Sequence, residues 1–152
     1  FVTMDYVKDN VEIVRRMIEE GHTVGNHSTK HPNFSECSTD RIQEEIVTLH
    51  DYVKEQFGYE MKYFRFPEGC FNEKSLETVN QLGYKSVFWS FAYSDWDTSK
   101  QMGETEALEK LQNGLHKGEI LLLHAVSSTN NAILGSFIDS SRNSGYEFIE
   151  LT

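Results

Sequence analysis

Residues 62–91, KYFRFPEGCFNEKSLETVNQLGYKSVFWSF, decide the fold class of this chain. The stretch begins with a strand pattern at 62–66 and ends with a strongly apolar strand pattern at 86–91. Between them, apolar residues recur at helical spacing before a terminating Gly83: Leu76, Val79 and Leu82. A strand, a helix and a second strand form a right-handed βαβ unit, so we expect the two strands to be parallel.

The same alternation of patterns continues on both sides of this stretch. Further strands are predicted at 1–3, 23–26, 120–123 and 146–149, and further helices at 10–20, 39–57, around 108–115 and around 133–138. Asp9 and Glu12 are expected to form a capping box at the first of these helices. Six strands and five helices in alternation predict an α/β fold with a parallel sheet. Periodicity leaves open whether that sheet is open and doubly wound or closed as a barrel.

Composition limits the classes of protein that the chain can represent. Its 152 residues suit one domain with a sizeable core, and a hydrophobic content of 38% indicates a globular chain. A net charge of −10 argues against nucleic acid as a partner, because phosphate backbones bind basic surfaces. No apolar run is long enough to span a membrane. Cys37 and Cys70 are interpreted as two free, partly buried thiols.

Unusual polar residues cluster at the carboxyl ends of the predicted strands. In chain order they are His27 and His31, Arg65, Asp95 with Trp96, and His124. Since parallel α/β folds bind ligands at that edge of the sheet, the pattern predicts a functional site there.

The histidine pair favours a metal site. Two imidazoles four residues apart on a helical turn can reach one divalent ion through their neutral nitrogens. His27 and His31 follow the predicted strand at 23–26, which supports this interpretation. The alternative is a solvated loop that ends at Pro32. A catalytic zinc site also needs a third protein ligand, and no motif in the sequence supplies an obvious one.

His124 ends an apolar strand, so it is either a satisfied core residue or a general acid that protonates a leaving amine. Asp95 could orient that imidazole. Arg65 could pair with a carboxylate at the mouth of the sheet or form an unimportant surface ion pair. Trp96 and Phe66 either line a sugar site or belong to the core.

Four motifs in a fixed order resemble a known family. They are His-Ser-x-x-His at 27–31, Arg-x-Pro-x-Gly at 65–69, Asp95-Trp96 after an apolar strand, and Leu122-Leu123-His124. This set resembles the polysaccharide deacetylases of carbohydrate esterase family 4, the nodulation-type (NodB) deacetylase domain, across essentially the whole chain. Residues 88–96, 124–127 and 130–132 look closest to the sporulation enzymes that deacetylate N-acetylmuramic acid in peptidoglycan.

The resemblance implies a distorted parallel (β/α)7-type barrel that lacks its first strand here. It implies metal-dependent hydrolysis of N-acetyl groups on cell-wall glycan, either peptidoglycan or a chitin-like oligosaccharide, with zinc as the expected ion. It also assigns roles to residues of this chain: His27 and His31 as metal ligands, Arg65 as the residue that holds the catalytic base, Asp95 as the partner of the acid His124, and Leu122, Trp96, Phe66 and Pro67 as the wall of the substrate groove.

The family's first motif, which carries the catalytic base and a further metal ligand as aspartates, is absent from residues 1–152. We therefore expect residues 1–152 to form one deacetylase domain that is incomplete at its N-terminus, and the fragment alone to lack part of the catalytic apparatus. Two alternatives are a non-catalytic glycan-binding module with the same fold and an open-sheet protein of the flavodoxin or response-regulator type. A cell-wall substrate predicts an exported bacterial protein on the extracellular or cell-wall side.

Overall fold

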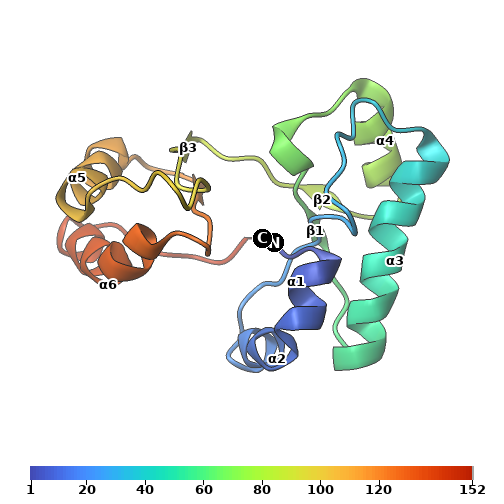
Figure 1. Cartoon of the computed structure of the whole chain (residues 1–152), viewed down its shortest axis with the longest axis horizontal. Coiled ribbons are helices and arrows are strands. Elements are labelled where there is room, and N and C mark those ends of the chain that lie inside the picture. The colour runs from blue at the N-terminus through green and yellow to red at the C-terminus, as the bar shows by residue number, and fades with distance from the viewer. Residues whose placement is uncertain (152) are drawn as a thin grey trace. The chain divides into compact units, whose positions relative to one another are not determined.

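The computed structural model describes residues 1–151, which form two compact units. The first unit runs from Phe1 to Phe88, and the second begins at Trp89 (Figure 1). Each unit has its own hydrophobic core and its own short parallel ladder. None of the helices within residues 1–151 combines the length and apolar character that a membrane crossing needs.

The first unit contains most of the helices and a small parallel sheet. Its elements are α1 (Met4–Asp9), α2 (Val11–Glu19), α3 (Thr39–Phe57), β1 (Tyr63–Phe64), a 3-10 turn (Pro67–Gly69), α4 (Glu73–Gln81) and β2 (Lys85–Ser86). β1 pairs with β2 in parallel, and single parallel bridges join Val2 to Asn26 and Asn26 to Phe64. The βαβ unit predicted from residues 62–91 is therefore confirmed in its first half, from β1 through α4 to β2.

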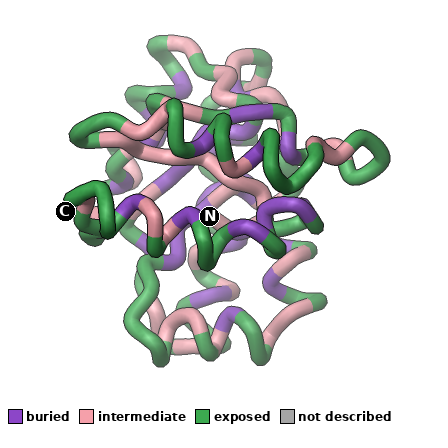
Figure 2. The backbone as a smooth tube through the Cα atoms, turned by 90° about the vertical axis from the view of Figure 1, so that its left-hand side faces the viewer, coloured by how far each residue is buried: buried purple, intermediate pink, exposed green. Residues whose placement is uncertain are grey.

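Local sequence signals set the ends of the two helices that flank this sheet. Ser38 caps α3 by accepting a hydrogen bond from the Arg41 N–H, and Gly58 ends the helix in the left-handed region at φ 65°. Asn72 and Ser75 form a reciprocal capping box at the start of α4. Figure 2 shows buried positions alternating with exposed ones along the backbone, as amphipathic helices require.

The beginning of the chain differs from the prediction. An additional helix, α1, follows Thr3, so residues 1–151 contain six α-helices where five were expected. The capping box of Asp9 with Glu12 is wrong, because Asp9 is the last residue of α1. Asn10 lies between α1 and α2, and its side chain donates to the Tyr6 carbonyl instead of capping α2.

The second unit packs two helices beside a second short ladder. It contains β3 (Phe91–Ala92), α5 (Glu104–Gly114), β4 (Leu121–Leu122) and α6 (Ser128–Asn143). β3 and β4 are parallel, and α5 and α6 pack against each other (Figure 1). The core between them is formed by Tyr93, Ala107, Leu111, Ile133 and Phe137.

The strands expected at 1–3 and 23–26 are reduced to single bridges at Val2 and Asn26, and two further predicted strands also differ. The strand expected at 86–91 is divided, since Ser86 belongs to β2 and pairs with β1, whereas Phe91 belongs to β3 and pairs with β4. Residues 146–149 form no strand, since Phe148 and Ile149 are 53% and 86% exposed and no strand within residues 1–151 pairs with this segment. The parallel α/β class is confirmed; closure into a seven-stranded barrel stays a prediction, as does the single-domain assignment.

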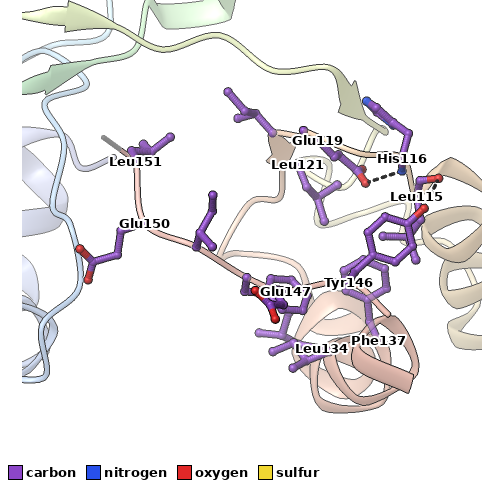
Figure 3. A pocket seen from close by; sticks show the side chains of 15 residues that line it. Leu115, His116, Glu119, Leu121, Leu134, Phe137, Tyr146, Glu147, Glu150 and Leu151 are labelled. Carbon is purple, nitrogen blue, oxygen red and sulfur yellow. Dashed lines mark hydrogen bonds between the residues drawn. The ribbon is translucent and has the colours of Figure 1, made fainter. Parts of the chain in front are cut away.

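A cavity of about 630 Å³ lies in the second unit, between β4, α6 and residues 146–151 (Figure 3). Its walls are mainly apolar, including Leu121, Leu134 and Phe137. Glu119 also lines it, and one carboxylate oxygen of Glu119 is buried without a hydrogen-bond partner in the described part of the chain. None of the catalytic or metal-binding residues predicted from the sequence lines this cavity.

Candidate functional site

Two of the histidines in the first unit, His27 and His31, lie side by side at the end of the central strand segment. Asn26 bridges Val2 on one side and Phe64 on the other, and His27 continues this segment by donating its N–H to the Val2 carbonyl at 3.0 Å. The chain then turns back, which brings the ring of His31 to 4.8 Å from the ring of His27, centroid to centroid, with the planes at 79°. The two rings are therefore close to each other, although residues 27–31 do not form the helical turn that was expected. Their role as metal ligands stays a prediction.

The surroundings of His27 fix its tautomer. Its Nδ1–H donates to the carbonyl oxygen of Arg65 at 2.8 Å, which leaves the lone pair on Nε2. Burial lowers the pKa of His27 to about 4, although the bond to that carbonyl acts in the opposite direction. His27 is therefore neutral near pH 7, the form in which imidazole binds metal ions.

The two imidazoles of this turn are chemically suited to bind one divalent ion. One oriented Nε2 beside a second imidazole supplies two nitrogen ligands, and a protein carbonyl supports the first in the manner usual for metal-binding histidines. Among residues 1–151 no cluster of three His, Cys, Asp or Glu side chains is placed to hold a metal. The nearby Asp5 is paired with Lys30 at 3.2 Å, through exposed side chains.

Arg65 is buried, with 8% of its surface exposed, so it is not a surface side chain. Its Nε donates to the Val87 carbonyl at 3.3 Å, and its guanidinium lies 4.1 Å from the centroid of the Phe1 ring. Burial lowers the pKa of Arg65 to about 10, which leaves it cationic at neutral pH. Its predicted role of holding a catalytic base stays a prediction.

His124 and Asp95 form a close pair in the second unit. The Asp95 side chain is fully buried, and its two oxygens accept from the Nδ1–H and the backbone N–H of His124, both at 2.7 Å. The His124 side chain remains 38% exposed. Because Nδ1 is engaged, Nε2 is the nitrogen that can exchange a proton with a ligand. The predicted contact between the two residues is confirmed.

A polar network that the sequence reasoning did not assign holds Asp95 in place. Asn130 donates from Nδ2 to Asp95 at 2.5 Å and accepts from the Tyr93 hydroxyl. Burial and the Asp95 charge raise the pKa of Tyr93, so it remains a donor at neutral pH. A usable signal existed in the sequence: Ser127 followed three residues later by Asn130 is an N-cap pattern, and the Asn130 N–H does donate to the Ser127 hydroxyl.

The residues predicted to line the substrate groove differ in how far they are exposed to solvent. Trp96 is 61% exposed, and Leu122 is half-buried in β4. Phe66 and Pro67 are buried, and the Phe66 ring packs against those of Phe34, Phe64 and Phe88. For Phe66 the core alternative therefore holds, and its assignment to the groove wall is wrong.

Phe71 is the exposed aromatic residue of the segment that follows Arg65. It is 46% exposed and contacts Phe88 at 4.9 Å between ring centroids. The sequence reasoning missed it because it lies beyond the Arg-x-Pro-x-Gly motif. Cys37 and Cys70 are half-buried free thiols, as expected.

Comparison with known proteins identifies the family. A model of the polysaccharide deacetylase family matches residues 1–87. The peptidoglycan-N-acetylmuramic acid deacetylase PdaA of Bacillus subtilis is 38% identical over 149 residues, which are 97% of this chain and 57% of that protein. The solved structure of Bacillus subtilis PdaA, a family 4 carbohydrate esterase, matches with a TM-score of 0.94 over 99% of this chain and 64% of its own.

The same fold occurs in a solved structure described as a family 4 pseudoenzyme from Bacillus anthracis. That chain is 22% identical, with a TM-score of 0.86 over 95% of this chain and 50% of its own. The first two curated relatives each have 57% of their length covered by this chain. Because the family model covers more than half of the 152 residues, the chain belongs to the polysaccharide deacetylase family.

Proposed function

We propose that the protein carrying this chain hydrolyses N-acetyl groups on peptidoglycan, with N-acetylmuramic acid as the preferred sugar. The observation that carries this proposal is the His124–Asp95 pair, in which a fully buried carboxylate holds the half-exposed imidazole through two bonds. Amide hydrolysis needs an acid that protonates the departing amine, and an imidazole oriented in this way is suited to that role. Similarity to an N-acetylmuramic acid deacetylase supports the choice of sugar.

His27 and His31 are assigned as ligands of a divalent metal ion, with zinc as the expected ion. Such an ion supplies a Lewis acid for the acetyl carbonyl and lowers the pKa of a bound water. The protein's part is to present two imidazole nitrogens, of which the first is oriented by the Arg65 carbonyl. The group that takes the proton of the attacking water is not among the residues assigned here.

In this proposal His124 gives a proton from Nε2 to the leaving nitrogen while Asp95 stabilises the imidazolium. Trp96 offers an exposed aromatic face to the glycan, since sugars stack on such surfaces. With peptidoglycan as the proposed substrate, we expect the protein on the extracellular or cell-wall side of a bacterium. Fractionation of the producing cells tests that location, and a purely cytosolic protein contradicts it.

The direct test is acetate release from purified glycan strands, with free amino groups located on muramic acid or glucosamine by mass spectrometry. We expect activity on N-acetylmuramic acid, its loss on treatment with a chelator and its return when zinc is added. Free amines on glucosamine alone would contradict the choice of sugar. Glycan binding without acetate release, in the presence of zinc, would favour the non-catalytic module.

A further inference from the structure

The turn that carries the two histidines has an unusual backbone. Ser28 has φ 70° and His31 has φ 55°, both in the left-handed region that residues other than glycine rarely adopt. Such a residue is strained and persists only where the surroundings hold it. The contact between the His27 and His31 rings depends on this turn, so whatever holds the backbone also positions the rings.

Every backbone N–H from Ser28 to His31 has a defined acceptor. Ser28 donates to Asn26 Oδ1 at 2.9 Å, and His31 donates to the Ser28 hydroxyl at 2.9 Å. The remaining two N–H groups both bond to Glu45 of α3. The Thr29 N–H donates to the backbone carbonyl oxygen of Glu45 at 3.1 Å. The Lys30 N–H donates to the carboxylate Oε2 of Glu45 at 2.6 Å. The Thr29 hydroxyl adds a third bond, to the Glu45 carbonyl at 2.9 Å.

Glu45 is an unexpected residue for its position on α3. It is 1% exposed and lies on the helix face that also buries Ile42, Ile46 and Leu49. A buried carboxylate costs free energy unless it is paired. Here Oε1 is paired with Arg41, one helical turn earlier, while Oε2 accepts from Lys30. An apolar side chain would fill the same face without that cost, so the carboxylate is explained by the turn that it holds.

We propose that the Glu45 side chain positions the His27–His31 pair by accepting the hydrogen bond of the Lys30 N–H, whereas the bonds from Thr29 go to the Glu45 backbone carbonyl and do not depend on the side chain. This inference shares one assumption with the proposed function, namely that His27 and His31 bind the metal ion. Both carboxylate oxygens of Glu45 accept hydrogen bonds from donors, Arg41 on one side and the Lys30 N–H on the other. Glutamine has the same shape but only one acceptor oxygen. In Glu45→Gln the NH2 group would therefore face either Arg41 or the Lys30 N–H, and both of these are donors, so one hydrogen bond is lost.

The test is a titration of Zn²⁺ into the metal-free protein, together with the visible spectrum of the Co²⁺-loaded protein, which reports ligand geometry. Glu45→Gln and Glu45→Ala should raise the Kd for Zn²⁺ by about 10–100-fold, the usual effect of removing a group that supports a metal ligand. Both should also shift the Co²⁺ bands. Lys30→Ala is the matched control: it removes the exposed Lys30–Asp5 ion pair but keeps the Lys30 N–H, and it should leave the Kd unchanged.

The outcomes separate this proposal from the proposed function. If both Glu45 variants bind Zn²⁺ like the wild type while His27→Ala does not, Glu45 has no positioning role and the metal site stands. If His27→Ala and His31→Ala leave binding unchanged, or the wild type binds no Zn²⁺, the metal assignment fails and this proposal fails with it. If both Glu45 variants lose the helical circular dichroism signal, Glu45 is a folding residue and the positioning role is overturned.

Discussion

The carboxylate of Asp95 holds His124 at two points, its ring Nδ1 and its own backbone N–H, both at 2.7 Å. A single contact would fix the ring's tautomer but leave it free to swing about its side-chain bonds. The second contact ties the carboxylate to the backbone from which the imidazole extends. The imidazole and its partner are therefore joined through both the ring and the backbone of His124.

Asp95→Asn tests this unit, because the amide replaces one acceptor oxygen with a donor and disturbs the His124 tautomer. We expect Asp95→Asn and His124→Ala each to lower kcat for deacetylation by about 10²–10⁴-fold, the range typical of lost general acid catalysis. Initial rates of acetate release measure the effect. Asp139→Asn, at an exposed position on α6, is the control and should retain full activity. Full activity in His124→Ala would contradict the acid role.

The Tyr93–Asn130–Asp95 chain predicts coupled losses of stability. Asn130→Ala removes a donor from a buried carboxylate, which should lower the free energy of unfolding by about 1–3 kcal/mol. Tyr93→Phe removes the hydroxyl that bonds to Asn130. Because the two side chains share one network, the double variant should lose less than the sum of the single losses, by about 0.5–3 kcal/mol. Urea unfolding of the four proteins measures this difference, and strict additivity would contradict the network.

The elements with strong local signals could be predicted from the sequence. Asn72 caps α4, Gly58 ends α3, and the contact between Asp95 and His124 follows from their places after two parallel strands. These features depend on spacing and on the geometry of a parallel sheet. The same reasoning could not find α1, because its six residues are too few to show a helical period.

Features that depend on contacts distant in sequence could not be read from local patterns. The strand expected at 86–91 looks continuous, yet its two ends pair with different partners, β1 and β4. Glu45 lies between Ile42 and Leu49 on an apolar helix face, and its partner Lys30 is 15 residues away. Only the folded turn at Ser28–His31 explains a carboxylate there.

His27 gives the metal-free protein a defined pH dependence. Burial lowers the pKa of His27 to about 4 in the folded state, whereas an unfolded histidine titrates near about 6.5. Between these values the unfolded state binds more protons, so stability should fall as the pH drops from about 6.5 towards 4. The full shift corresponds to about 3 kcal/mol.

Urea unfolding at a series of pH values, with a chelator present, measures this contribution. His27→Asn should flatten the fall in stability over that pH window. His22→Asn, at an exposed histidine of the same unit, should leave it unchanged. An equal fall in stability in the wild type and in His27→Asn would show that His27 is not buried in its neutral form.

Phe66 and Phe71 form a matched pair for the last prediction. Their ring centroids are 5.6 Å apart, yet Phe66 is 1% exposed and Phe71 is 46% exposed. Phe66→Ala removes a ring that packs against Phe34, Phe64 and Phe88, so it should lower the free energy of unfolding by about 3–5 kcal/mol.

Phe71→Ala should lower the free energy of unfolding by less than Phe66→Ala does, because nearly half of the Phe71 side chain is in contact with water in the folded state. If Phe71 is an aromatic surface for glycan, the same variant should raise KM for peptidoglycan strands while kcat stays close to the wild-type value, since uniform binding is lost. Phe71→Tyr keeps an aromatic face and should restore KM. Unchanged KM in Phe71→Ala would remove Phe71 from the substrate surface and leave Trp96 as the exposed aromatic residue assigned to it.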